Sequence, residues 1–457
     1  MPHQTLRYLA RAHSNLVAPM TLRGRRPRIL VQVNSLELGG SQINAVDLAA
    51  GVTDLGFEPI LIGPADSRPC GPSLFDVAAD RGVRVEPFRR PLTTLSGARE
   101  LSRLAAEHRA DLVHVYGTWS IRPAYWGPCA LARRPLVITV YEMDVDPVVY
   151  TAPPLIVGTG YLVDELIDRR GQVRLISPPV DLERDNVTHV QTQQFLQQHD
   201  LDPRNVRVVI VSRLDGEPLR PVKTTAVEAA LGAMARLDRP DVDLVVVGTG
   251  KDAAQLRSLA QEVNARLGRR GCVFTGPLHD PRPAYASADV VLGMGGSAAR
   301  GLAFGKPLIV TGEYGWFDTF RPETAQRLFR NSFWSEEIKS DPADELLRDL
   351  APLLEDGSER CALGAYGRGF AESHFSLSAM SQRLADVYEQ AFSYGPADWL
   401  HDLRLESKWA AGWLGRHFPM PGSISRRARA WSDPYRARGA FTPPPSAGSL
   451  QDRRGVE

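Results

Sequence analysis

The stretch DVVLGMGGSAAR at residues 289–300 places an apolar run, a glycine loop and the start of a helix in direct succession. The run at 289–292 is typical of a buried strand in a parallel sheet, and residues 298–304 have helix-forming composition before Gly305 and Pro307. Glycines let backbone N–H groups approach a ligand closely, and a helix N-terminus favours negative charge. The stretch therefore predicts a phosphate-binding loop, with a tight turn that binds nothing as the alternative.

Four residues of this stretch are candidates for contacting a phosphate group. Gly295, Gly296 and Ser297 form the loop, and Arg300 is expected in or near the first turn of the helix. A cation in that turn opposes the helix dipole, so its presence favours a bound anion. The alternative for Arg300 is a side chain that extends into solvent.

Strands alternate with helices on both sides of this stretch. The expected strands are 28–33, 59–62, 83–85, 112–115 and 136–140 in a first series, and 206–211, 242–247, 272–274, 290–292 and 308–310 in a second. Such alternation produces parallel sheets covered by helices on both faces. The prediction is an α/β fold of two Rossmann-like, doubly wound domains with the ligand cleft between them.

The chain divides into five expected parts. These are a basic extension (1–27), a first domain (28–180), a second domain (181–377), C-terminal helices (378–420) and a disordered tail (421–457). The amphipathic helix at 378–392 is expected to close the second domain. The aromatic and basic stretch at 399–440 fits either a peripheral membrane contact or packing on the protein itself.

Composition excludes several classes of function. The chain has 457 residues, 43% hydrophobic and 23% charged, and its net charge of +1 argues against a nucleic-acid partner. Four cysteines without a C-x-x-C pair indicate neither a zinc site nor a redox motif, and they fit a reducing cytoplasm. We see neither a signal peptide nor an apolar run long enough for a membrane span.

Arg213 and Lys223 form a second candidate anion site. Arg213 follows the expected strand at 206–211, and Lys223 lies near the start of the next helix. The chain has only five lysines, so this lysine is more informative than a typical arginine here. The two cations can converge on a diphosphate, while the alternative is a pair of solvated surface residues.

A nicotinamide-binding function is set aside. The segment GTGKDA at 248–253 has dinucleotide-type spacing, but the next strand, at 272–274, ends without the acid that would bind the ribose.

In their order along the chain, these elements resemble the GT-B nucleotide-sugar glycosyltransferases of the family 4, retaining type. The resemblance covers residues 28–392. The matching segments are 34–41, 111–114, 137–140, 176–181, 212–214 with Lys223, 247–250, 274–276, 288–290, 303–307 and the helix through Tyr388.

The resemblance implies a function and roles for individual residues. Gly39 and Gly40 would face the donor or the acceptor, while Arg213 and Lys223 would bind the donor diphosphate. The reaction would move a sugar from a nucleotide-diphosphate donor to the hydroxyl of a glycan, lipid-linked or small-molecule acceptor in a bacterial cytoplasm. Neither a metal nor a cofactor is required, because two cations can neutralise the leaving group.

The chain departs from the family pattern at three positions. The two glutamates usual around the glycine loop are Leu292 and Arg300 here, and the usual histidine is Tyr141. Substitutes are therefore expected: Tyr141 and Glu142 for the sugar or acceptor, and Glu313 for ribose or sugar hydroxyls.

Two alternatives follow from these departures. One is a non-catalytic descendant that binds a sugar nucleotide or a partner protein, which the missing carboxylates favour and the complete glycine loop opposes. The other is a GT-B epimerase or hydrolase, which would need clustered acids; the candidates are Glu142, Asp144, Asp146 and Glu313.

Overall fold

The computed structural model describes residues 24–65, 73–146, 149–215, 224–335, 337–393, 404 and 406–407. The chain forms two compact units: Met1–Asp144 with Thr151–Pro396, and Val145–Tyr150 with Ala397–Glu457. Lys223, the tail 421–457, and most of the extension 1–27 and of the stretch 399–440 lie outside the described residues. Among the residues described, none of the helices combines the length and apolarity needed to cross a membrane.

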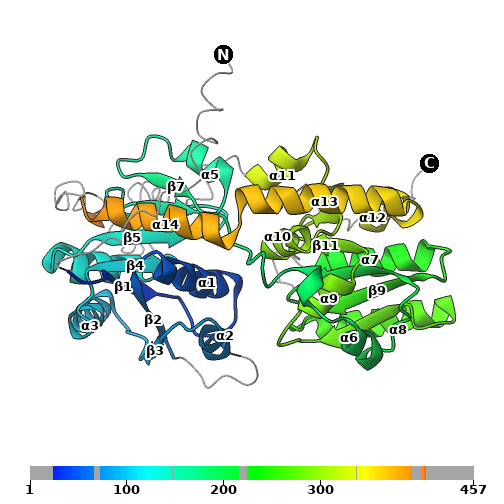
Figure 1. Ribbon diagram of the computed structural model, residues 1–457, viewed down its shortest axis with the longest axis horizontal. Helices are drawn as coiled ribbons and strands as arrows, with labels where there is room; N and C mark the ends of the chain where they lie inside the picture. Colours follow the sequence, from blue (N-terminus) through cyan, green and yellow to red (C-terminus); the bar gives the residue numbers. More distant parts are fainter. Residues whose placement is uncertain are drawn as a thin grey trace, which may run out of the picture. The chain divides into compact units, whose positions relative to one another are not determined.

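The larger unit contains two sheets, and the first has seven parallel strands in the order β3-β2-β1-β4-β5-β6-β7 (Figure 1). Its central strands β1, β4, β5 and β6 are almost entirely buried, as expected for a parallel sheet covered on both faces, whereas the edge strands β3 and β7 are partly exposed. The bounds are β1 Arg28–Gln32, β2 Glu58–Pro64, β3 Val85–Phe88, β4 Leu112–Tyr116, β5 Leu136–Val140, β6 Leu155–Val157 and β7 Val173–Leu175.

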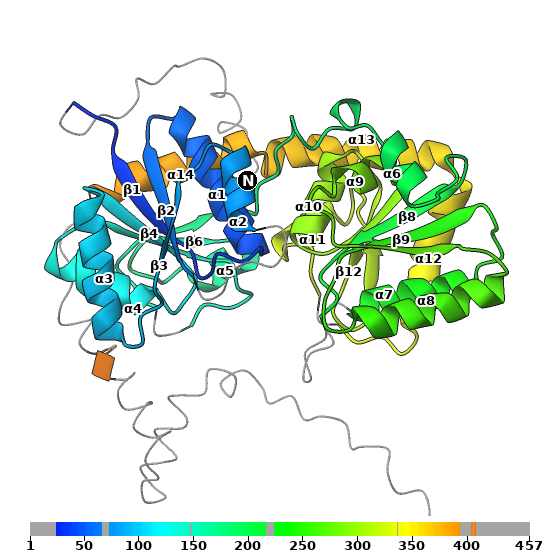
Figure 2. The same cartoon turned by 90° about the horizontal axis from the view of Figure 1, so that it is seen from below.

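Helices cover both faces of this first lobe. Figure 2 shows α3 and α4 on one side of the sheet and α1 on the other. The bounds are α1 Gly40–Asp54, α2 Leu74–Asp80, α3 Thr94–Glu107, α4 Ile121–Ala124, the π-helical turn η3 Tyr125–Leu131 and α5 Gly160–Glu165. Helix α3 begins at a capping box in which Thr93 and Ser96 satisfy each other's backbone N–H groups.

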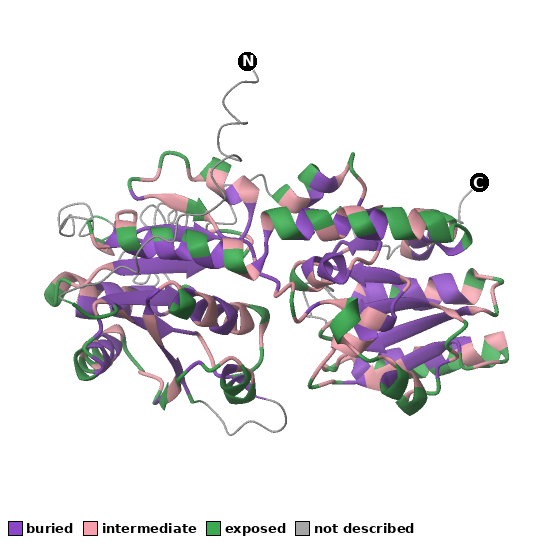
Figure 3. Cartoon of the chain, in the orientation of Figure 1, coloured by how far each residue is buried: buried purple, intermediate pink, exposed green. Residues whose placement is uncertain are grey.

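The second sheet has the order β10-β9-β8-β11-β12-β13, and only its edge strand β13 is antiparallel. Its strands contribute alternate residues to two apolar cores, with Val208 and Ile210 in one and Val209 in the other. Figure 3 shows these central strands buried beneath their covering helices. The strands are β8 Val206–Val211, β9 Val242–Val247, β10 Cys272–Gly276, β11 Val290–Gly293, β12 Leu308–Thr311 and β13 Phe317–Thr319.

The helices of the second lobe lie between and after these strands. They are the 3₁₀ turn η4 Val187–His189, α6 Gln193–Gln198, α7 Thr224–Arg236, α8 Ala253–Leu267, α9 Arg282–Ser287, α10 Gly296–Ala303, α11 Ala325–Arg330, α12 Pro342–Glu355 and α13 Gly357–His374.

The last helix, α14 (Leu377–Ala391), corrects one prediction. It was expected to close the second domain, but Met380, Leu384 and Tyr388 lie in the core of the first lobe with residues of α1. A Cβ at Gly51 of α1 would lie only 1.9 Å from the Ser381 hydroxyl oxygen, so the glycine permits the close approach of the two helices. The chain therefore returns to its first lobe after completing the second.

Each sheet has one point at which its strand order reverses, between β1 and β4 in the first sheet and between β8 and β11 in the second. In open α/β sheets, ligands bind outside the carboxyl ends of the strands at such a point. The loops after these four strands are therefore where the site residues should be found.

Candidate functional site

The glycine loop lies at the reversal point of the second sheet. Strand β11 ends at Gly293, and α10 starts at Gly296 after the N-cap Gly295, whose φ of 55° and ψ of −124° favour glycine. A Cβ at Gly293 would lie 2.9 Å from the backbone nitrogen of Ala298, whereas one at Gly295 or Gly296 would meet nothing within 4 Å. The loop is thus tightly closed on its inner side and open at Gly295 and Gly296.

Ser297 stabilises the turn of this loop through two hydrogen bonds to the backbone of Met294. Its hydroxyl donates to the carbonyl of Met294 (2.9 Å) and accepts from the N–H of the same residue (3.1 Å). These bonds close the turn, and the role of Ser297 in phosphate binding stays a prediction.

Arg213 follows β8 at the other side of the reversal point. It is exposed and has no ion-pair or hydrogen-bond partner for its side chain within the described part of the chain. Lys223, its expected companion, lies outside the described residues.

The loop after β9 supports the loop that carries Arg213. The N–H of Leu214 donates to the carbonyl of Thr249 (2.9 Å), and the N–H of Lys251 donates to the Asp215 carboxylate (2.7 Å). A Cβ at Gly248 would lie 1.9 Å from the carbonyl oxygen of Ser212. The glycine spacing that resembled a dinucleotide motif therefore serves close packing of two loops.

The structure corrects the expected position of Arg300. Because α10 starts at Gly296, Arg300 lies in the last turn of the helix, where a cation is favourable, so the helix-dipole argument for a bound anion is wrong. Its Nε donates to the buried carboxylate of Asp185 at 3.0 Å, and this carboxylate raises the pKa of the guanidinium. Only Nε makes a hydrogen bond within the described residues, so a direct phosphate contact stays a prediction.

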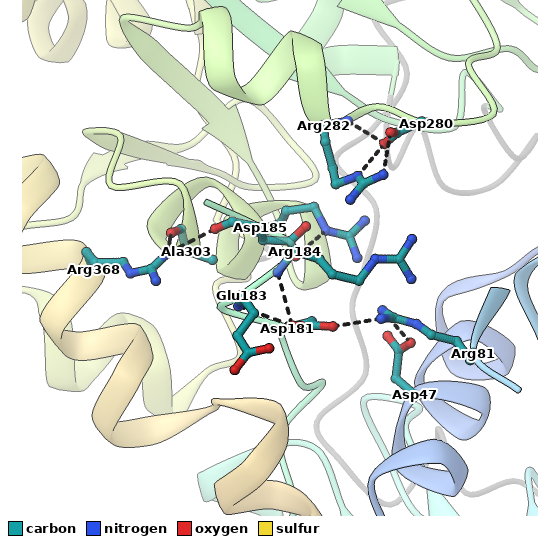
Figure 4. Close-up of polar contacts among 11 residues, drawn as sticks. Asp47, Arg81, Asp181, Glu183, Arg184, Asp185, Asp280, Arg282, Ala303 and Arg368 are labelled. Atoms are coloured by element: carbon teal, nitrogen blue, oxygen red, sulfur yellow. Dashed lines mark hydrogen bonds and ion pairs between the residues drawn. The ribbon is translucent and has the colours of Figure 1, made fainter. Parts of the chain in front are cut away.

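A chain of ion pairs connects α1 to the segment between the two lobes (Figure 4). Arg81, at the end of α2, pairs with Asp47 of α1 at 2.8 Å and with Asp181 at 2.7 Å. Burial raises the pKa of Asp47, and the charge of Arg81 opposes that rise. The positions of Asp47 and Asp181 are thereby tied to one guanidinium.

The connecting segment is also attached to the second lobe. Arg368 of α13 donates to the carbonyls of Leu182 and Asp185, each at 2.9 Å, and to the carbonyl of Ala303 in α10. In Figure 4, Arg184 extends from this segment toward Arg81, and its guanidinium has no ion pair among the described residues. Residues 181–185 are thus fixed to both α2 and α10.

Glu313 lies two residues beyond β12 and is buried, although its side chain makes no hydrogen bond in the part of the structure that is described. Its N–H donates to the carbonyl of Ser335 (3.0 Å), and the N–H of Gly295 donates to that of Phe333 (3.3 Å). The segment 333–335 thus contacts both Glu313 and the glycine loop. Two consecutive left-handed residues, Ser332 and Phe333, shape this turn, which is a strained arrangement of a kind often found near functional sites.

Tyr141 and Glu142 follow β5 in the first lobe. The Tyr141 ring packs on Tyr116, with 6.1 Å between ring centroids, and against Gly158, where a Cβ would lie 2.8 Å from the ring. Its hydroxyl is buried without a partner among the described residues, and burial raises the pKa of this phenol. Glu142 is exposed. These two residues offer a neutral hydroxyl and a solvated carboxylate at the same strand end.

The predicted glycine pair begins α1. Gly39 is the N-cap of the helix, and an added Cβ there would approach only the flexible side chain of Gln42. A Cβ at Gly40 would meet nothing within 4 Å. Open backbone therefore follows β1 as well as β11.

Three residues at the reversal point of the first sheet were missed by the sequence analysis. Gln32 is fully buried with both amide atoms unpartnered, and Asn34 Oδ1 and Trp119 Nε1 are also buried without partners among the described residues. Arg90 stacks its guanidinium 4.8 Å from the Trp119 ring centroid and donates to the Asn34 carbonyl (2.9 Å). A glutamine inside the apolar run RILVQV was the available signal.

Comparison with known proteins agrees with this architecture. A Glycosyltransferase Family 4 model matches residues 38–184, and a Glycosyl transferases group 1 model matches residues 205–355. Together the two matches span more than half of the chain.

One curated relative is the GDP-mannose-dependent monoacylated alpha-(1-6)-phosphatidylinositol monomannoside mannosyltransferase of Corynebacterium glutamicum. It is 28% identical over 166 residues, which span 33% of this chain and 40% of the relative.

Two solved structures show the fold. A glycosyltransferase from Rickettsia africae aligns over 81% of this chain and 100% of its own, with a TM-score of 0.63 at 14% identity. Anabaena Alr3699/HepE, in complex with UDP and glucose, aligns over 80% and 100%, with a TM-score of 0.59 at 18% identity. With its two Rossmann-like lobes and both family models in order, the chain belongs to the family 4, group 1 type of GT-B glycosyltransferases.

Proposed function

We propose that this protein transfers a sugar, with retention of anomeric configuration, from a nucleotide-diphosphate donor to an acceptor hydroxyl. One observation carries the proposal: an open glycine loop and an exposed Arg213, which has no partner among the described residues, follow neighbouring strands at the reversal point of the second sheet. Backbone N–H groups at a helix N-terminus with a nearby guanidinium are suited to a diphosphate.

In this proposal the second lobe binds the donor. Gly295, Gly296 and Ser297 contact the diphosphate from the start of α10, while Arg213 and Lys223 neutralise its charge as it leaves. Arg300 can join them through its terminal nitrogens, because its bond to Asp185 uses only Nε.

The sugar and the acceptor would lie between the donor and the first lobe. Glu313 and Tyr141 are proposed to hydrogen-bond sugar hydroxyls, and Glu142 to accept the proton of the acceptor hydroxyl. The bond between the anomeric carbon and the diphosphate breaks, and a bond to the acceptor oxygen forms. Gly39 and Gly40 would let the donor or acceptor approach the start of α1.

The relatives indicate which substrates to test first. The curated relative is named for GDP-mannose and a phosphatidylinositol mannoside acceptor, and the HepE structure holds UDP and glucose. We therefore propose a GDP- or UDP-sugar donor and a glycan or lipid-linked acceptor at the cytoplasmic side of a membrane.

The test measures nucleoside diphosphate released from GDP-mannose, UDP-glucose and related donors, with and without candidate acceptors. Acceptor-dependent release with one donor, lost in Arg213→Ala, is the expected result. The matched control is Arg266→Ala, another exposed arginine without a described partner. Donor binding without release under any condition would favour the non-catalytic alternative, and neither binding nor release would contradict the proposal.

A further inference from the structure

An exposed apolar segment lies at the carboxyl edge of the first sheet, directly after β3. Leu92 is 94% exposed and Leu95 is 61% exposed, although leucines are usually buried. Two arginines flank them, Arg89 before and Arg99 after. We call Arg89, Leu92, Leu95 and Arg99 the α3 ridge.

The α3 ridge is held in an ordered conformation. Thr93, between the two leucines, caps α3 by accepting from the N–H of Ser96 (3.1 Å). Arg90 is attached to the Asn34 carbonyl and to the Trp119 ring. The two leucines are therefore presented on a fixed turn, and their exposure is not the result of local fraying.

The charge of this segment has one sign. Residues 89–99 contain three arginines and no acid. Arg89 and Arg99 are exposed and have no ion pair within the described residues, and Arg99 lies one helical turn after Leu95. The nearest acid in sequence, Glu100, is already paired with Arg103 at 2.8 Å. The ridge thus combines exposed apolar side chains with unneutralised positive charge.

We propose that the α3 ridge docks on an anionic lipid surface, with Leu92 and Leu95 entering the interface and Arg89 and Arg99 contacting lipid phosphates. Apolar side chains beside unpaired cations are suited to this surface, because burial and electrostatic attraction add. A nucleic acid would leave the leucines unused. The ridge shares its sheet edge with Gln32 and Trp119, so docking would bring lipid headgroups to the edge of the first sheet that carries these residues. This inference goes beyond the proposed function and does not depend on it.

The test is co-sedimentation of the full-length protein with vesicles of phosphatidylcholine alone or mixed with phosphatidylglycerol. We expect binding to the mixed vesicles, with the partition coefficient reduced about tenfold or more in Leu92→Ser/Leu95→Ser. Leu131→Ser is the matched control. It is 75% exposed but lies at the end of η3, near the opposite edge of the sheet, and should leave binding unchanged.

The arginines are tested separately. Arg89→Gln/Arg99→Gln should weaken binding to the anionic vesicles about tenfold at low salt, and much less at high salt. Arg257→Gln/Arg266→Gln, on α8 of the second lobe, removes the same charge and should have no such effect. No vesicle binding by the wild type, or equal binding of wild type and both ridge variants, would overturn the inference. The second result would point to the tail 393–457 as the lipid-binding segment.

Discussion

The reversal points of the two sheets share a topology but offer different polar groups. The second sheet offers open glycine backbone at the start of α10 and the cation Arg213, which is unpaired within the described part of the chain. The first sheet offers buried neutral groups, at Gln32, Trp119 and Tyr141, that have no hydrogen-bond partner in the described structure. A diphosphate needs charge and backbone N–H groups, whereas sugar hydroxyls need neutral donors and acceptors. This difference supports our proposal that the donor binds to the second lobe and the acceptor to the first.

The largest expected effect is a loss of turnover from changes at the carboxyl edge of the second sheet, which we call the charged edge because it carries Arg213. Arg213→Ala/Lys223→Ala should lower turnover about 100-fold to 1000-fold, because charge on the leaving diphosphate loses its stabilisation. The measurement is kcat/KM for donor with saturating acceptor. Arg257→Ala/Arg266→Ala is the control for loss of two exposed arginines. Turnover within a factor of two of wild type would remove the assignment of this edge to the diphosphate.

Variants of the ion pair between Arg300 and Asp185 distinguish a structural role of Arg300 from a role in donor binding. Asp185→Asn should lower the free energy of unfolding by about 1–3 kcal/mol, less than for a fully buried pair because the Arg300 side chain keeps 27% exposure. Urea unfolding of the protein without donor measures this loss.

Arg300→Met should destabilise similarly, and its effect on donor affinity tests the second role. A purely structural Arg300 would leave the donor dissociation constant, measured by calorimetry, nearly unchanged. A loss of affinity that Asp185→Asn does not share would identify a direct phosphate contact.

Substitutions of two neighbouring glycines, Gly295 and Gly296, distinguish the conformational role of the loop from its proposed role in donor binding. Gly295→Ala should destabilise the protein by about 1–3 kcal/mol, because its backbone conformation is unfavourable for alanine. Gly296→Ala is the matched change in the helix and should leave stability equal or raise it by up to about 1 kcal/mol.

Gly296→Ala nevertheless places a methyl group in the open space where the diphosphate is proposed to bind. We expect a weaker donor affinity without a lower melting temperature. Unaltered affinity in this variant would mean that the donor does not approach α10 at Gly296.

The smallest expected effect is at the carboxyl edge of the first sheet, which we call the neutral edge because its buried polar groups Gln32, Trp119 and Tyr141 are uncharged. Tyr141→Phe removes a buried hydroxyl without a described partner, so the unfolding free energy should be unchanged or rise by up to about 1 kcal/mol. Turnover should nevertheless fall about tenfold, because the proposed hydrogen bond from this hydroxyl to the sugar is lost. Because burial raises the pKa of Tyr141, the phenol stays neutral below that raised value, and the loss should be constant across neutral pH.

A matched change, Gln32→Leu, addresses the same edge from β1. It should also be neutral or stabilising, with an increased KM for the acceptor and an unchanged KM for the donor. A strong loss of stability in either variant would show that these polar groups have structural partners and would weaken the comparison between the two edges.

The sequence predicted the fold because strands and loops are local features. The run at 112–115 became β4, and the glycine loop lies between β11 and α10 as expected. The packing of α14 was not predictable, because an amphipathic pattern shows that one face is buried without showing what covers it.

The site was less predictable for two physical reasons. The first helical residue of α10 depends on the backbone angles of Gly295. Because α10 starts only after this glycine, Arg300 lies in the last turn of the helix and not in the first turn, where it was expected. Its partner Asp185 is 115 residues away in sequence, and no spacing rule reveals such a pair. The unpartnered state of Gln32 likewise depends on which atoms surround it, so the sequence offers only a polar residue in an apolar strand.

Hydrogen exchange with a bound nucleoside diphosphate tests the central claim most directly. The account predicts slower exchange in residues 212–215 and 293–299 of the second lobe, with no change in residues 32–40 and 117–120 of the first. Protection confined to the first-lobe segments, or absent from both at saturating ligand, would contradict the assignment of the charged edge to the donor.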